Sequence, residues 1–119
     1  MSDGASNSAY ENLASELRRG VLVLAVLAQC DEVQYGYSLK QQLSAAGLDI
    51  NEGTLYPLLR RLEGQGLLAS EWLMTEDRPR RYYKLSPAGT AVLQKLMTEW
   101  HELVGIVARL LPEQENHSI

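Results

Sequence analysis

The strongest constraint on the fold of this chain is a change of hydrophobic period at Gly66. Before it, residues 51–66 read NEGTLYPLLRRLEGQG and place four leucines on one side of a helix. These leucines are Leu55, Leu58, Leu59 and Leu62. After it, residues 67–74 and 81–86 follow a period of two, which predicts two strands joined by a polar loop of about six residues. Any fold must therefore place a helix directly before a β-hairpin.

The opposite side of the 51–66 helix carries hydrogen-bond donors. They are Thr54, Tyr56, Arg60, Arg61 and Gln65. Such groups contact the phosphates and base edges of nucleic acids. The same side chains also suit the solvated face of an ordinary core helix. This helix alone leaves both interpretations open.

The ends of this helix carry recognisable signals, but its interior contains a proline. Asn51 is a suitable N-cap, and Gly66 suits the C-terminal end. Pro57 removes a backbone hydrogen bond beyond the first turn. We therefore expect the helix either to begin near Gly53 and Thr54 or to bend at its start.

The segment before this helix reads as a second helix. Residues 35–46 place Leu39 and Leu43 inward, and Gly47 can end the helix in the left-handed conformation that glycine tolerates. Two helices joined by such a short turn form a helix-turn-helix. With the hairpin, the predicted fold class is mainly α with a small β-hairpin (α+β), a winged helix-turn-helix.

The N-terminal third of the chain predicts two more helices. Residues 10–17 predict a short amphipathic helix with Tyr10, Leu13 and Leu17 on one side, and residues 18–29 are apolar nearly all round, which predicts a central buried helix. A very short strand fits Val33 and Gln34. Residues 1–9 are small and polar, which predicts a disordered tail.

The C-terminal segment, residues 87–111, predicts a long helix with Ser86 as N-cap and Pro87 at its first position. Its apolar stripe is longer than a small winged-helix core can cover, so we expect a partner surface, most simply for a second copy. The expected dimer-interface residues are Leu93, Leu96, Met97, Trp100, Leu103, Val104, Val107 and Leu111. The predicted organisation is thus a tail (1–9), a winged-helix domain (10–86), a dimerisation helix (87–111) and a polar tail (112–119).

Basic charge is concentrated in one region of an acidic protein. The net charge is −4, yet residues 60–84 hold six of the eleven lysines and arginines. Arg78, Arg80 and Arg81 lie at the predicted hairpin tip or its base. This distribution predicts a localised binding face for nucleic-acid phosphate.

Several classes of function fit the sequence poorly. It has no apolar run of membrane-spanning length and no secretory signal, and the single Cys30 fits a reducing cytoplasm. Cys30, His101 and His117 are too few for a zinc site. Because no phosphate-binding loop, nucleophile elbow or spaced carboxylate pair is present, we expect no enzyme, no metal and no cofactor.

Five blocks in order carry a resemblance to a known family. They are LRRGVLVLAVLA, YGYSLKQQL, NEGTLYPLLRRLEGQGLL, PRRYYKLSPAG and a final helix containing EW. Together, over about residues 17–111, they resemble the PadR family of bacterial transcriptional regulators, in particular the small subgroup with a single C-terminal dimerisation helix. The resemblance implies a homodimer that binds a palindromic operator, usually as a repressor, and that is often relieved by phenolic acids, drugs or other effectors.

The resemblance also implies roles for individual residues. It places Tyr35, Tyr37, Thr54, Tyr56 and Arg60 at or near DNA, and Arg80 and Arg81 on the wing. Trp100 holds the position of an aromatic residue that lines a pocket at the dimer interface in some members. From the residues themselves we add Lys40, Arg61 and Arg78 as candidate DNA contacts.

Some alternatives stay open at this point. Arg61 could pair with an acid, Tyr35 or Tyr37 could pack in the core, and Trp100 could pack without binding a small aromatic effector. The alternative function for the whole chain is a dimeric winged-helix adaptor that acts through protein contacts without DNA. The localised arginines favour DNA, because such an adaptor has no need of them.

Overall fold

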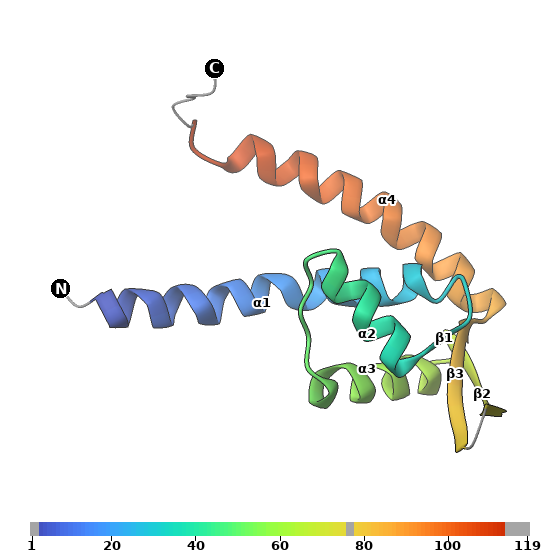
Figure 1. The fold of residues 1–119 in the computed structure, drawn as a ribbon. Helices are drawn as coiled ribbons and strands as arrows, with labels where there is room; N and C mark the ends of the chain where they lie inside the picture. Colours follow the sequence, from blue (N-terminus) through green and yellow to red (C-terminus); the bar gives the residue numbers. More distant parts are fainter. Residues whose placement is uncertain (1–2, 76–77, 114–119) are drawn as a thin grey trace.

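The computed structural model describes residues 3–75 and 78–113 as four helices and one three-stranded antiparallel sheet (Figure 1). The elements are α1 (Asp3–Gln29), β1 (Gln34–Tyr35), α2 (Gly36–Ala45), α3 (Glu52–Gly64), β2 (Leu68–Thr75), β3 (Arg78–Leu85) and α4 (Pro87–Leu110). Strand β3 lies between β1 and β2. This is the α+β winged helix-turn-helix arrangement that the sequence predicts, with β1 added to the hairpin.

The leucine stripe of α3 forms the centre of the core. Leu55, Leu58, Leu59 and Leu62 are all buried, as the helical spacing predicts. They cluster with buried residues from α1 and the turn after it, α2, β2, β3 and α4: Val26, Leu27, Cys30, Leu39, Leu43, Leu68, Tyr83, Leu85 and Leu93. Burial raises the pKa of the Cys30 thiol to about 12, so the thiol stays protonated and packs as a small hydrophobe.

Helix α1 is longer and more continuous than the sequence analysis predicts. It runs without interruption from Asp3 to Gln29, so the two expected helices are one. The prediction of a disordered tail is wrong for residues 3–9, and residues 1–2 lie outside the described part of the chain. The C-terminal end of α1 is anchored in the core through Val26 and Leu27. Once a helix is anchored, each further turn is easier to form, because every added hydrogen bond requires the backbone of only one more residue to be ordered.

The hairpin has longer strands than predicted. Strands β2 and β3 stay paired as far as Thr75 and Arg78, both of which fall in the predicted loop of about six residues, and residues 76–77 lie outside the described part of the chain. Pro79, which falls in the predicted loop between residues 74 and 81, lies within β3. Because β1 pairs with β3 only at Tyr82 and Tyr83, β3 has an open edge at Pro79, and open edges tolerate proline.

Both ends of α3 follow the sequence signals. The backbone N–H of Thr54 donates to the side-chain oxygen of Asn51 at 2.9 Å, and Gly66 has a φ of +79° just beyond the helix. The helix begins at Glu52 and continues through Pro57. Pro57 has no N–H for the carbonyl of Gly53 four residues earlier, but Gly53 is exposed and water can bind that carbonyl.

Helix α4 is fixed to the end of the sheet by its first turn. The Ser86 hydroxyl oxygen accepts from the backbone N–H of Gly89 at 2.9 Å, and Pro87 occupies the first helical position, as predicted. Gly89 lies against the carbonyl of Leu67 with no room for a Cβ atom. The helix ends at Leu110, one residue before the predicted end, and Leu111 is its C-cap.

Candidate nucleic-acid interface

The turn between α2 and α3 fixes the direction of α3. Gly47 has a φ of +106°, and the next residue, Leu48, donates its backbone N–H to the carbonyl of Leu43 at 2.8 Å. The Ser44 hydroxyl donates to the Asp49 carboxylate at 2.6 Å across the same turn. These bonds join the two helices rigidly, so α3 is presented at one side of the domain (Figure 1).

The outer face of α3 carries the polar side chains that the sequence places there. Thr54, Arg60, Arg61 and Gln65 are exposed, while Tyr56 is half-buried. The alternative in which Arg61 pairs with an acid is not seen among residues 3–75 and 78–113. The result is a continuous row of donors over a buried leucine layer.

Tyr56 is held in place by the start of α2. Its ring lies so close to Gly36 that a Cβ atom on Gly36 would overlap it. Burial raises the pKa of the Tyr56 phenol, and the negative charge of Glu52 raises it further. The phenol therefore stays protonated at neutral pH and keeps a hydrogen to donate at the edge of the α3 face.

Tyr35 and the start of α2 carry a second group of candidate residues. Tyr37 is exposed and accepts a hydrogen bond from the Gln41 amide at 3.1 Å, while Tyr35 and Lys40 are half-buried. The expected strand at Val33 and Gln34 is shifted by one residue, to Gln34–Tyr35. Gln34 itself is buried, and its amide donates to the carbonyl of Gln29 at 3.2 Å.

The three wing arginines lie on two different faces of the hairpin. Strand residues alternate between faces, so Arg78 and Arg80 share one face, and Arg81 lies on the other with Tyr83 and Leu85. Tyr83 and Leu85 are buried, which makes the face of Arg81 the inner one. Arg78 is exposed and Arg80 is half-exposed on the outer face.

Arg80 is supported by two tyrosines of the sheet. Its guanidinium carbon lies 4.8 Å from the ring centroid of Tyr35, within the range of a cation–π contact. The Tyr35 ring in turn packs against Tyr82, with centroids 5.5 Å apart. This contact restricts Arg80 without neutralising its charge.

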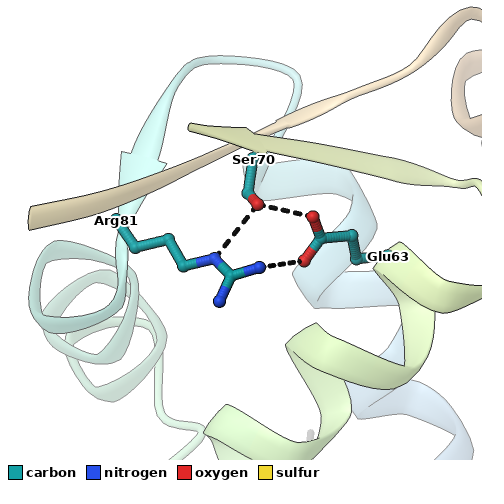
Figure 2. Close-up of polar contacts among 3 residues, drawn as sticks. All are labelled: Glu63, Ser70 and Arg81. Atoms are coloured by element: carbon teal, nitrogen blue, oxygen red, sulfur yellow. Dashed lines mark hydrogen bonds and ion pairs between the residues drawn. The ribbon is translucent and has the colours of Figure 1, made fainter. Parts of the chain in front are cut away.

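Arg81 has a different environment from the one expected for a phosphate contact. One of its terminal nitrogens lies 2.9 Å from a carboxylate oxygen of Glu63, at the end of α3, and its Nε donates to Ser70 (Figure 2). Its position follows from the period-two alternation, which groups Arg81 with buried Tyr83. Glu63 and Ser70 are the partners that the sequence analysis did not identify.

Trp72 lies on the same face of the wing as Arg81 but is 63% exposed. The Arg81 guanidinium lies over its ring at 5.6 Å. Trp72 is therefore not a core residue, and it packs at the edge of the hairpin.

A separate apolar groove of about 810 Å³ runs between α1 and α4. On α4 it is lined by Leu96, Glu99, Trp100, Leu103, Val104, Val107 and Ala108, and by Leu111 just beyond the helix. Trp100, Leu103, Val104 and Val107 are all exposed, although they are large and apolar. These are the central members of the interface predicted from the sequence.

Three expected interface residues are placed differently. Leu93 is 8% exposed and belongs to the core of the protomer, so it offers almost no surface to a second chain. The apolar stripe of α4 has two parts. Its first turns pack against the core of the protomer, and its later turns line the groove. Leu96 packs against the core and also reaches the groove, while Met97 is exposed outside the groove lining.

The wall of the groove formed by α1 was not identified from the sequence. It consists of Leu17, Gly20, Val21, Val23 and Leu24. Farther along the same helix, Tyr10 and Leu13 are also exposed. The spacing of Tyr10, Leu13 and Leu17 was a visible signal, but it did not reveal that α1 and α4 lie together.

Within residues 3–75 and 78–113, no helix combines the length and hydropathy that crossing a membrane requires. The same ranges contain no group of three or more His, Cys, Asp or Glu side chains placed to hold a metal ion.

Comparison with known proteins identifies the family. The model of the "Transcriptional regulator PadR-like family" matches residues 23–95, more than half of the chain. The chain belongs to the PadR family. It is a transcriptional regulator, as the sequence resemblance implies, and members of this family are not enzymes.

Individual PadR relatives support this assignment. A transcriptional regulator of Mycobacterium tuberculosis is 43% identical over 79 residues, which cover 66% of this chain and 74% of the relative. The crystal structure of a PadR family regulator from Eggerthella lenta has 44% identity and a TM-score of 0.86, and the match covers 92% and 98% of the two chains. A PadR-like regulator from Bacillus cereus has 27% identity and a TM-score of 0.74, with 83% and 99% covered.

Proposed function

We propose that this PadR regulator binds operator DNA as a homodimer, with α3 in the major groove and the hairpin along the phosphate backbone. The observation that carries this proposal is the exposed donor face of α3, which includes Thr54, Arg60 and Arg61 over a buried leucine stripe. Arg78 and Arg80 on the outer face of the wing add positive charge beside it. We include Tyr35, Tyr37, Lys40 and Tyr56 among the proposed DNA contacts.

The homodimer is proposed from the groove between α1 and α4. The exposed apolar wall on α4 faces a partly exposed one on α1, and such an uncovered apolar groove is typical of a surface that is covered in the working protein. A second copy related by a two-fold axis can cover both grooves at once. The dimer would place two copies of α3 about one DNA turn apart, roughly 34 Å, which requires a palindromic operator.

Repression relieved by a small aromatic effector is the regulatory part of the proposal. Trp100 lines the groove and is 40% exposed, so its ring is available to stack on a flat ligand. The groove volume lies within the usual range for small-molecule sites. An effector bound between the two chains would favour one spacing of the α3 helices and thereby change operator affinity.

The test is a gel shift with the DNA immediately upstream of the coding sequence, because such regulators often control their own expression. We expect a discrete complex that survives excess nonspecific competitor and that weakens when a candidate aromatic effector is added. A cytoplasmic location accords with this role and with the single, buried Cys30. Failure to bind any duplex, even at low salt, would instead favour the protein adaptor.

A further inference from the structure

We propose that Glu63, Ser70 and Arg81 form a clamp that sets the angle of the wing relative to α3. In this view Arg81 is a positioning residue for DNA binding and does not itself contact phosphate. The inference rests on the DNA binding proposed above, and it reassigns one of the arginines that the sequence attributes to the DNA surface.

The three side chains form a closed ring of contacts (Figure 2). Arg81 donates through one terminal nitrogen to Glu63 at 2.9 Å and through Nε to the Ser70 hydroxyl at 3.1 Å. The Ser70 hydroxyl donates its own hydrogen to the second carboxylate oxygen of Glu63 at 2.5 Å. Each residue is therefore bonded to both others, and the three come from α3, β2 and β3.

The surroundings favour a geometric role for this ring over a large contribution to stability. The Arg81 and Glu63 side chains are 35% and 28% exposed, so solvent screens much of their attraction. However, the Arg81 guanidinium also lies over the rings of Trp72 and Tyr83, at 5.6 Å and 5.7 Å from their centroids. A planar group held by two hydrogen bonds and two rings has little freedom to turn toward DNA.

The position of the clamp allows it to control the wing. At the base of the hairpin, the backbone N–H of Leu67 donates to the carbonyl of Leu62 in α3, and β1 pairs with β3 along one edge of the hairpin. The clamp adds a tie from the hairpin directly to the C-terminal end of α3. Arg78 lies three residues beyond Arg81 on β3, about 10 Å farther out. A small rotation at the clamp would therefore displace the outer arginines relative to the α3 face.

Replacing Glu63 by Gln distinguishes the clamp from direct phosphate contact. If Arg81 contacts DNA, losing the neighbouring acid should leave affinity unchanged or increase it, because Arg81 is freed and repulsion of phosphate falls. If the clamp positions the wing, Glu63→Gln should weaken binding by about three- to tenfold, since a charge-assisted bond is lost. The probe is a duplex selected by the wild-type protein from a random-sequence pool.

Glu71→Gln is the matched control, because Glu71 is an exposed acid on β2 that lies on the other face of the hairpin. It removes the same charge without touching the clamp and should not weaken binding. Equal effects of the two variants, or tighter binding by Glu63→Gln, would overturn the proposal. Arg81→Ala should lower affinity with an unaltered salt dependence, whereas a phosphate contact would reduce the slope by about one.

Nuclear magnetic resonance tests the clamp without DNA. The Arg81 Nε–H signal should exchange slowly with solvent in the wild-type protein and rapidly in Glu63→Gln, because the bonds that hold the guanidinium are lost. Rapid exchange in the wild type would refute the clamp itself. If the wild-type protein binds no duplex while this signal is protected, the proposed function fails and the clamp remains as a structural contact only.

Discussion

The protein exposes two surfaces, one formed by α3 and the hairpin and the other by the groove between α1 and α4. The first is polar and positively charged, and the second is apolar. The α3 face presents arginines, a hydroxyl and a phenol above a leucine stripe that is already buried within the protomer. The groove presents Trp100, Leu103 and Val107, whose apolar side chains have no such cover. Both surfaces are exposed to solvent, but only the second exposes large apolar side chains.

The difference indicates two kinds of partner. A polar face whose underlying apolar residues are already buried gains little free energy when it is removed from water. Such a face suits a hydrated, charged partner such as DNA. An uncovered apolar face gains about 25 cal/mol for each square ångström that another apolar surface removes from water. We therefore propose operator DNA as the partner of the first surface and another copy of the chain as the partner of the second.

The largest effect is expected from charging the groove. Trp100→Asp should produce monomers. Operator affinity should then fall by about a hundredfold or more, because the two copies of α3 are no longer held in one dimer. Sedimentation measures the association, and circular dichroism checks that the chain remains folded. If Trp100→Asp unfolds, Val104→Asp provides the same test, because Val104 is a second residue that lines the groove.

His101→Asp is the matched control for the groove. It introduces the same charge one residue along α4, at an exposed position outside the groove lining. We expect it to leave both association and DNA affinity nearly unchanged. A stable Trp100→Asp dimer with wild-type affinity would show that the groove is not the interface.

A smaller effect is expected from a single side chain of the α3 face. Arg60→Ala should weaken operator binding by about 1–3 kcal/mol if the guanidinium contacts a base edge, and it should leave the dimer intact. A gel-shift titration measures the loss. Lys95→Ala removes one positive charge from exposed α4, and if it weakens binding equally, Arg60 has no specific role.

The smallest effect at moderate salt is expected from the outer face of the wing. Arg78→Ala combined with Arg80→Ala should lower affinity for all sequences and reduce the slope of log affinity against log salt by about two. Lys95→Ala combined with Arg109→Ala removes the same charge from α4 and should not change the slope. An unaltered slope in the wing variant would place both arginines away from phosphate.

Much of this architecture follows from local patterns in the sequence. The leucine stripe of α3, its N-cap Asn51 and the N-cap Ser86 of α4 all take the predicted roles, because each depends on contacts within a few residues. The length of α1 and the extent of the two hairpin strands could not be predicted this way. They depend on tertiary anchoring and strand pairing, which local polarity and Pro79 obscured.

The candidate surfaces show the same limit. The donors of α3 are visible in the sequence because they alternate with leucines on one helix. The pairing of Arg81 with Glu63 and the α1 wall of the groove require residues far apart in sequence to meet. The position of Leu93 in the core also depends on where α4 crosses the domain, which its apolar stripe alone does not specify.

The central claim is that the two surfaces act together, with one joining two chains and the other reading DNA. Sedimentation of the wild-type protein with its selected operator duplex tests this directly. The account predicts a complex of two chains on one duplex, formed by a protein that is already dimeric without DNA. A complex of one chain per duplex, or a dimer that binds no duplex at low salt, would contradict it.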